Sequence, residues 1–215
     1  MLHKMWYFLL LFPILYNIGK RENFQYCISA FLLAIAITEL MSYLIWFEII
    51  TPIKHSSVLN PIPFMSHISY NPILTFAIYL VLYQIFLNKN LSNFKFSIYS
   101  FFAIIMIINM FITGGRAGQV MFFAMLAILI FQFFDGQKIK SLLVIIIIIP
   151  LVFFTSYQTS NLFKHRVDLA VNDIMTYSEK PNTSVGLRIT FALNSWEVIK
   201  ENPIIGVGTG DFPTE

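Results

Sequence analysis

The chain has 215 residues, of which 57% are hydrophobic, 17% aromatic and only 12% charged, whereas about a quarter of the residues in a soluble domain are charged. This composition excludes a cytosolic enzyme, and the single cysteine excludes a secreted domain held by internal disulfides. The net charge is +3 without a long basic run, so no nucleic-acid partner is indicated. The predicted fold class is all-α: a polytopic transmembrane helical bundle with one wetter region.

Apolar stretches predict about six membrane spans, near residues 5–19, 24–50, 71–87, 96–113, 117–134 and 141–157. A spanning helix needs about 20 apolar residues, so the first stretch, interrupted by Pro13, is the doubtful one, and a re-entrant helix is its alternative. A signal peptide is disfavoured because Lys20 and Arg21 stand where small residues are expected.

The distribution of Lys and Arg over the short loops predicts the orientation of the bundle. One side collects six (Lys20, Arg21, Lys89, Lys95, Lys138 and Lys140) and the other three (Lys4, Lys54 and Arg116). Because basic residues stay on the cytoplasmic side, the side with six is expected to be cytoplasmic. The turn at 114–118 and residues 158–215 are then periplasmic.

Residues 158–215 form a large water-exposed loop, because they hold seven of the eleven acidic residues and no long apolar run. Within this loop Ser184 is the expected N-cap of an amphipathic helix that ends before Pro203. The apolar face of this helix is expected to rest on the bundle or at the membrane interface, with Trp196 at headgroup depth. The stop at Glu215, in a Gly- and Pro-rich stretch, predicts a piece of a longer protein.

Arg116 is the first candidate functional residue, in the short turn Thr113-Gly114-Gly115-Arg116-Ala117-Gly118. An arginine near the hydrocarbon is costly, so it is a functional candidate, although a snorkelling helix-end anchor is the simpler alternative. Neighbouring glycines allow close approach of a ligand, and the start of the next helix offers free N–H groups. A diphosphate fits this combination.

Arg188 is the second candidate, on the first turn of the amphipathic helix and on the predicted side of Arg116. A helix-surface arginine is more often a solvated charge. Two guanidinium groups on one side of a membrane nevertheless match the bidentate geometry of a lipid-linked diphosphate.

These residues resemble the bacterial O-antigen ligase and polymerase superfamily of polytopic glycan transferases. The resemblance rests on Gly115-Arg116-Ala117-Gly118 at the start of a span, and on the stretch RITFALNSWEVIKENPIIGVGTGDF, residues 188–212. This second motif resembles the family pattern of an Arg, a Trp eight residues later, and a Glu-x-Pro-x-x-Gly-x-Gly ending.

The resemblance implies transfer of a glycan from an undecaprenyl-diphosphate carrier to a glycan or lipid A-core acceptor, at the periplasmic face of a bacterial inner membrane. No metal and no cofactor is implied. Arg116 and Arg188 would hold the diphosphate, and the same site would include Gly115, Gly118, Trp196, Gly206 and Gly208. Family ligases use a later histidine as general base, which is expected beyond Glu215, so this chain alone is expected to be inactive.

Other polar residues are weaker candidates. His67 is expected on the periplasmic side, where a capped or interfacial histidine is the simpler interpretation, and neither His55 nor His165 matches the family's histidine. Glu39 lies near the middle of a span, so its carboxyl must be protonated, paired or facing a cavity. A paired structural carboxyl is favoured over a proton pathway. The glycines at 206–210 do not form a nucleotide-binding motif.

Three functions stay open within the transferase class: a ligase, an O-antigen polymerase and a protein O-oligosaccharyltransferase share the donor chemistry. From another class, a transporter or translocase of an anionic lipid-linked substrate would also use two arginines. Transporters more often place ionisable residues near the midplane, which favours the transferase.

Overall fold

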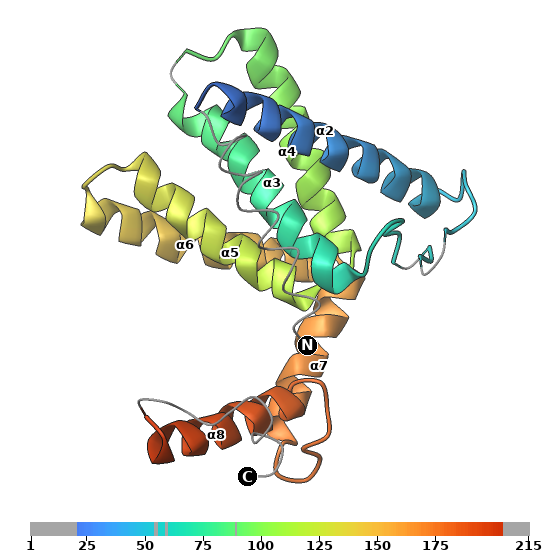
Figure 1. The fold of residues 1–215 in the computed structure, drawn as a ribbon, viewed down its shortest axis with the longest axis vertical. Helices are drawn as coiled ribbons and strands as arrows, with labels where there is room; N and C mark the ends of the chain where they lie inside the picture. Colours follow the sequence, from blue (N-terminus) through green and yellow to red (C-terminus); the bar gives the residue numbers. More distant parts are fainter. Residues whose placement is uncertain (1–20, 54–55, 59, 89, 204–215) are drawn as a thin grey trace. The chain divides into compact units, whose positions relative to one another are not determined.

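The computed structural model describes residues 21–53, 56–58, 60–88 and 90–203, and within them the regular secondary structure is all helical, with one isolated bridge between Ser57 and Asn60 in a loop. The helices, labelled as in Figure 1, are α2 (Arg21–Trp46), α3 (His67–Leu87), α4 (Asn93–Ile112), α5 (Arg116–Phe133), α6 (Lys138–Thr159), α7 (Asn161–Met175) and α8 (Gly186–Glu201). The expected span at 5–19 lies outside the described residues.

Five of these helices, α2 to α6, are long and apolar enough to cross a membrane. Each lies on one of the expected apolar stretches, and each exposes many large apolar side chains to its surroundings. A helix that is apolar on most of its faces is typical of a membrane span. The protein is therefore a multi-pass helical membrane protein.

Helix α3 is the centre of the bundle, because it packs most extensively against α5 and α4 and also contacts α2 (Figure 1). Its side chains Tyr70, Leu74, Ala77 and Ile78 are all buried. Helix α6 packs on α5. Small and polar residues recur where α3 meets its neighbours, as expected in lipid, where apolar side chains alone give little drive for helices to associate.

Helix α2 ends earlier than the apolar stretch predicted. The expectation was a span to Ile50, whereas the helix ends at Trp46 and Glu48 adopts a left-handed backbone conformation with φ of 59°. Such a conformation is unfavourable for a residue with a side chain and cannot continue a right-handed helix. The apolar residues after Trp46 therefore belong to the loop that leads to α3.

Two compact units divide the chain, the first ending at Leu162 and the second beginning at Phe163. The second contains most of α7 and all of α8. Helix α7 was not predicted, although Phe163, Val167, Ala170 and Ile174 follow the spacing of one helix face.

The prediction of Ser184 as N-cap of α8 is wrong. Helix α8 begins at Gly186, its N-cap position is Val185, and no N-cap side chain bonds to the helix start. Instead Thr183 Oγ1 accepts a hydrogen bond from Gly186 N at 3.1 Å, and Asp173 Oδ2, on α7, accepts one from Val185 N at 3.4 Å. The start of α8 is thus stabilised from a neighbouring helix, which local sequence does not reveal.

Candidate functional site

The turn between α4 and α5 carries Arg116 at a sharply defined place. Thr113 caps the C-terminal end of α4, and its backbone N–H donates to Asn109 O at 2.9 Å. Gly115 is the N-cap of α5 and has no side chain to bond the first N–H groups of the helix. Arg116 is the first residue of α5 and is half-buried. The positive end of the α5 dipole and the residue that carries the guanidinium therefore lie at the same end of the helix.

The glycines of this turn allow a close approach of α3. An ideal Cβ at Gly115 would lie 2.2 Å from Asn71 Nδ2, and one at Gly118 would lie 2.3 Å from Asn71 Cβ and 2.6 Å from its backbone carbonyl carbon. No side chain larger than hydrogen fits at either position without movement of α3. We expected these glycines to allow the close approach of a neighbouring group. In the structure Asn71 of α3 is such a group.

Hydrogen bonds between buried groups fix the turn to α3. The Thr113 hydroxyl donates to Asn71 Oδ1 at 3.0 Å, and the Thr75 hydroxyl donates to Gly118 O at 2.9 Å. Asn71, Thr75 and Thr113 are each at most 1% exposed. Buried hydrogen bonds away from water hold such a turn in one arrangement, since leaving either group unsatisfied is costly. The place of Arg116 is therefore set by a different helix from its own.

One end of the bundle gathers the turn and the exit of the chain from α6. Ser160 directly follows α6, and its hydroxyl donates to Phe111 O near the end of α4 at 2.8 Å. A largely apolar cavity of about 780 Å³ lies at this end, lined by residues that include Ile108, Phe111, Val152 and Thr159. The turn with Arg116 and the chain that leads into the second unit thus emerge from the same end of the bundle.

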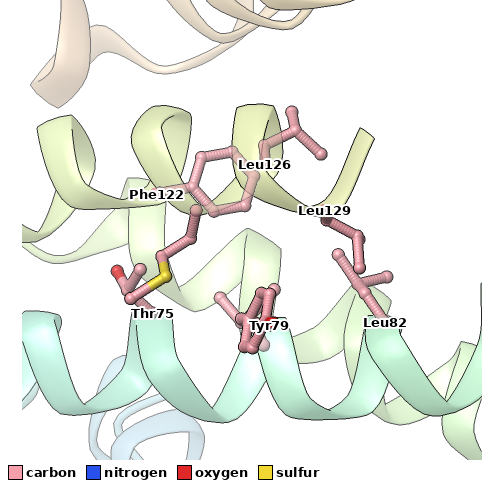
Figure 2. Close-up of a pocket in the computed structure, with 8 residues that line it drawn as sticks. Thr75, Tyr79, Leu82, Phe122, Leu126 and Leu129 are labelled. Carbon is pink, nitrogen blue, oxygen red and sulfur yellow. The ribbon is translucent and has the colours of Figure 1, made fainter. Parts of the chain in front are cut away.

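A second, much smaller cavity lies between α3 and α5, shown in Figure 2. Thr75, Tyr79 and Leu82 on α3 face Phe122 and Leu129 on α5 across it. Its volume is about 10 Å³, which is at the lower limit for a single water molecule. This cavity is a small imperfection of the helix packing and has no room for a ligand.

Arg188 and Trp196 both lie on α8 in the second unit and are exposed. Arg188 is in the first turn of the helix, and Lys200 Nζ lies 5.8 Å from the centre of the Trp196 ring. The structure brings Gly115, Arg116 and Gly118 together in one turn. It describes Arg188 and Trp196 within a separate unit. Gly206, Gly208 and His55 lie outside the described residues.

Glu39 is buried within the bundle, with 2% of its surface exposed. Tyr70 Oη, on α3, donates a hydrogen bond to Glu39 Oε1 at 2.5 Å. Next to it on α2, Ser42 Oγ accepts a hydrogen bond from Asn109 Nδ2 of α4 at 2.9 Å. These bonds join α2 to α3 and α4, and Glu39 takes part as a hydrogen-bonded carboxyl.

His67 is the first residue of α3 and is half-buried. Its Nδ1 lies 3.5 Å from Asn60 Nδ2 in the preceding loop, a contact at the outer limit of a hydrogen bond. Among the described residues no cluster of three or more His, Cys, Asp or Glu side chains is placed to bind a metal ion.

Comparison with known proteins identifies the family. The family model described as O-antigen ligase matches residues 101–215, which include the Arg116 turn and Arg188. The chain belongs to the O-antigen ligase family. A relative from Haemophilus influenzae, described as an uncharacterized protein, is 31% identical over 162 residues. This alignment covers 71% of the chain but 39% of the relative, so the chain spans about two fifths of that protein. No solved structure matches.

The residues that sequence reasoning missed in this O-antigen ligase family member are those that place Arg116, namely Asn71, Thr75 and Thr113. A signal for two of them is present, because Asn71 and Thr75 are polar, lie four residues apart and so share one face of an apolar span. Their pairing with a turn some 40 residues later is a tertiary contact, and the spacing along one helix cannot reveal it.

Proposed function

We propose that the full-length protein is a glycan transferase of the inner membrane that uses an undecaprenyl-diphosphate-linked donor and works at the periplasmic face. The observation that carries this proposal is the family match over residues 101–215, combined with Arg116 fixed at the start of α5. In the reaction an acceptor hydroxyl attacks the anomeric carbon of the glycan. The bond from that carbon to the diphosphate oxygen breaks, and the lipid diphosphate leaves.

The two arginines have an electrostatic role in this proposal. Negative charge builds on the diphosphate as it departs, and Arg116 and Arg188 bind its oxygens. Donors fixed in advance stabilise such charge most in the transition state. Gly115, Gly118 and the start of α5 would border the diphosphate. The acceptor hydroxyl also needs a base, which the family resemblance assigns to a histidine after the second motif.

The donor lipid and the glycan would be bound by neighbouring surfaces. The apolar cavity between α4 and α6 supports the proposal, because an isoprenoid chain requires an apolar surface at the end of the bundle where the turn lies. Trp196, Gly206 and Gly208 belong to the second motif and would lie along the glycan. A ligase, a polymerase and a protein oligosaccharyltransferase share this donor site, and they are separated by the acceptor.

The arginine assignment is tested by transfer assays on the purified full-length protein with a lipid-diphosphate donor and each class of acceptor. Arg116→Lys and Arg188→Lys should each reduce kcat by about a hundredfold, since the charge remains but the bidentate fork is lost. Arg166→Lys, on α7, is the matched control and should leave transfer unchanged. Wild-type turnover in Arg116→Lys would reduce Arg116 to a helix-end anchor and overturn its role.

The proposed orientation has its own test. With Cys27 and any further native cysteine of the full-length protein replaced by Ser, Thr159→Cys should react with a membrane-impermeant thiol reagent in intact spheroplasts. A cysteine at Gln137, in the connection between α5 and α6, should react only after the membrane is opened. The reverse pattern would place the Arg116 turn on the cytoplasmic side and exclude a periplasmic donor site.

A further inference from the structure

We propose that Asn71 of α3 is a positioning residue for Arg116, setting where the guanidinium meets the donor diphosphate. This inference rests on the proposed function, because it assumes that Arg116 binds the diphosphate. Asn71 itself is 0% exposed and would not touch the donor. It would act through the backbone of the turn that carries Arg116.

The geometry places Asn71 against both sides of this arginine in the chain. Before it, Thr113 donates its hydroxyl hydrogen to Asn71 Oδ1 at 3.0 Å, and Gly115 leaves room for Asn71 Nδ2. After it, Gly118 lies against the Asn71 backbone and Cβ. Asn71 thus contacts Thr113 and Gly115 before Arg116 and Gly118 after it. Displacement of this side chain must move the turn.

Stability alone does not explain an asparagine at this position. Asn71 Nδ2 is buried and has no hydrogen-bond partner among the described residues. The Thr113 hydroxyl has a second acceptor, Asn109 O at 3.0 Å, so it would stay bonded without Asn71. A leucine of similar shape would remove the unsatisfied buried amide and leave the Thr113 hydroxyl bonded to Asn109 O, so we expect the substitution to cost little stability. Stability is therefore not what favours an asparagine here, and its link from α3 to the turn points to a positioning role.

Asn109 offers a matched control within the same bundle. It is also a buried asparagine, 1% exposed, and one atom of its amide, Oδ1, likewise has no hydrogen-bond partner in the described part of the chain. Its Nδ2 donates to Ser42 Oγ on α2, and its side chain also hydrogen-bonds with Glu39 of α2, so its side-chain bonds are to α2 and not to the turn. Asn109→Leu therefore repeats the chemical change of Asn71→Leu while leaving the link to the turn in place.

The first experiment measures kcat and KM for the lipid donor in the full-length protein. Asn71→Leu should lower kcat about tenfold or more, because small displacements of a positioned group are costly in catalysis, while the unfolding midpoint stays near that of the wild type. Asn109→Leu should leave kcat close to the wild-type value. In a double variant with Arg116→Lys, Asn71→Leu should add little further loss, since both changes remove the same interaction.

Three results would overturn the inference: an Asn71→Leu variant with wild-type kcat, a loss of kcat that follows the loss of folded protein, or effects of the two substitutions that multiply independently. If the wild-type protein shows no transfer, the proposed function fails, and a second readout decides on Asn71. With Cys27 and any further native cysteine replaced by Ser, the rate at which a thiol reagent modifies Arg116→Cys is measured. Adding Asn71→Leu should change this rate of modification, and adding Asn109→Leu should not. An unchanged rate in the Asn71→Leu variant refutes the link between Asn71 and the turn.

Discussion

A methyl group added at Gly118 is the most direct test of how closely α3 and α5 approach. In Gly118→Ala the new Cβ would lie 2.3 Å from Asn71 Cβ, 2.6 Å from Asn71 C and 2.9 Å from Asn71 Cα, whereas ordinary contacts begin at 3.4 Å. Two of these three atoms belong to the backbone of α3, so a change of rotamer cannot relieve the overlap. The two helices must separate locally by about 1 Å, at a cost of roughly 1–3 kcal/mol for forced overpacking.

The same separation weakens the hydrogen bond from Thr75 Oγ1 to Gly118 O, now 2.9 Å long, which contributes about 1 kcal/mol. We therefore expect the free energy of unfolding, measured by SDS titration in mixed micelles, to fall by about 2–4 kcal/mol. Ala117→Val adds bulk to the same turn of α5 at an exposed position and should cost well under that amount. Equal stability of Gly118→Ala and the wild type would refute the close packing of α3 on α5.

Two further substitutions test contacts elsewhere in the chain. Tyr70→Phe removes the hydroxyl that donates to Glu39 Oε1 and leaves this buried carboxyl oxygen without its donor. The same SDS titration should therefore show that the free energy of unfolding falls by about 1–3 kcal/mol. An unchanged free energy of unfolding would contradict the contribution of this hydrogen bond. Asp173→Ala removes the acceptor for Val185 N at the start of α8, which should cost about 1 kcal/mol. Faster hydrogen exchange confined to the first turn of α8 would be its signature, and unaltered exchange there would contradict the assigned contact.

Hydropathy was sufficient to predict the helices of the bundle, because in lipid a span is selected by length and apolar composition alone. It failed at the end of α2, where Phe47, Ile49 and Ile50 are as apolar as the helix before them but lie after its last residue, Trp46, around the left-handed backbone conformation of Glu48. Hydropathy measures preference for an apolar environment and contains no information on backbone conformation. Hydropathy could therefore not predict where α2 ends.

The wetter segment shows the opposite failure. There α7 went unpredicted because charged residues such as Lys164, Arg166 and Asp168 interrupt its apolar positions, and because it begins directly after α6 with only Ser160 between them. The expected N-cap Ser184 has the right chemistry, and yet the helix starts two residues later. Asp173, on another helix, supplies an acceptor at the start of α8. The local sequence pattern therefore indicated the wrong residue, because the hydrogen bond is a tertiary contact.

At the candidate site, the packing of the helices changes how the glycines of the sequence motif are interpreted. Glycines beside Arg116 first favoured a ligand, since glycine lets a neighbour approach closely. In the structure that neighbour includes Asn71, and small residues at helix contacts are common in membrane proteins because close backbones replace the missing hydrophobic drive. Gly115 and Gly118 thus have a role in helix packing that does not depend on a ligand. The argument for diphosphate binding consequently rests on Arg116, on the start of α5 and on the family match, while the glycines explain why the arginine is held so firmly.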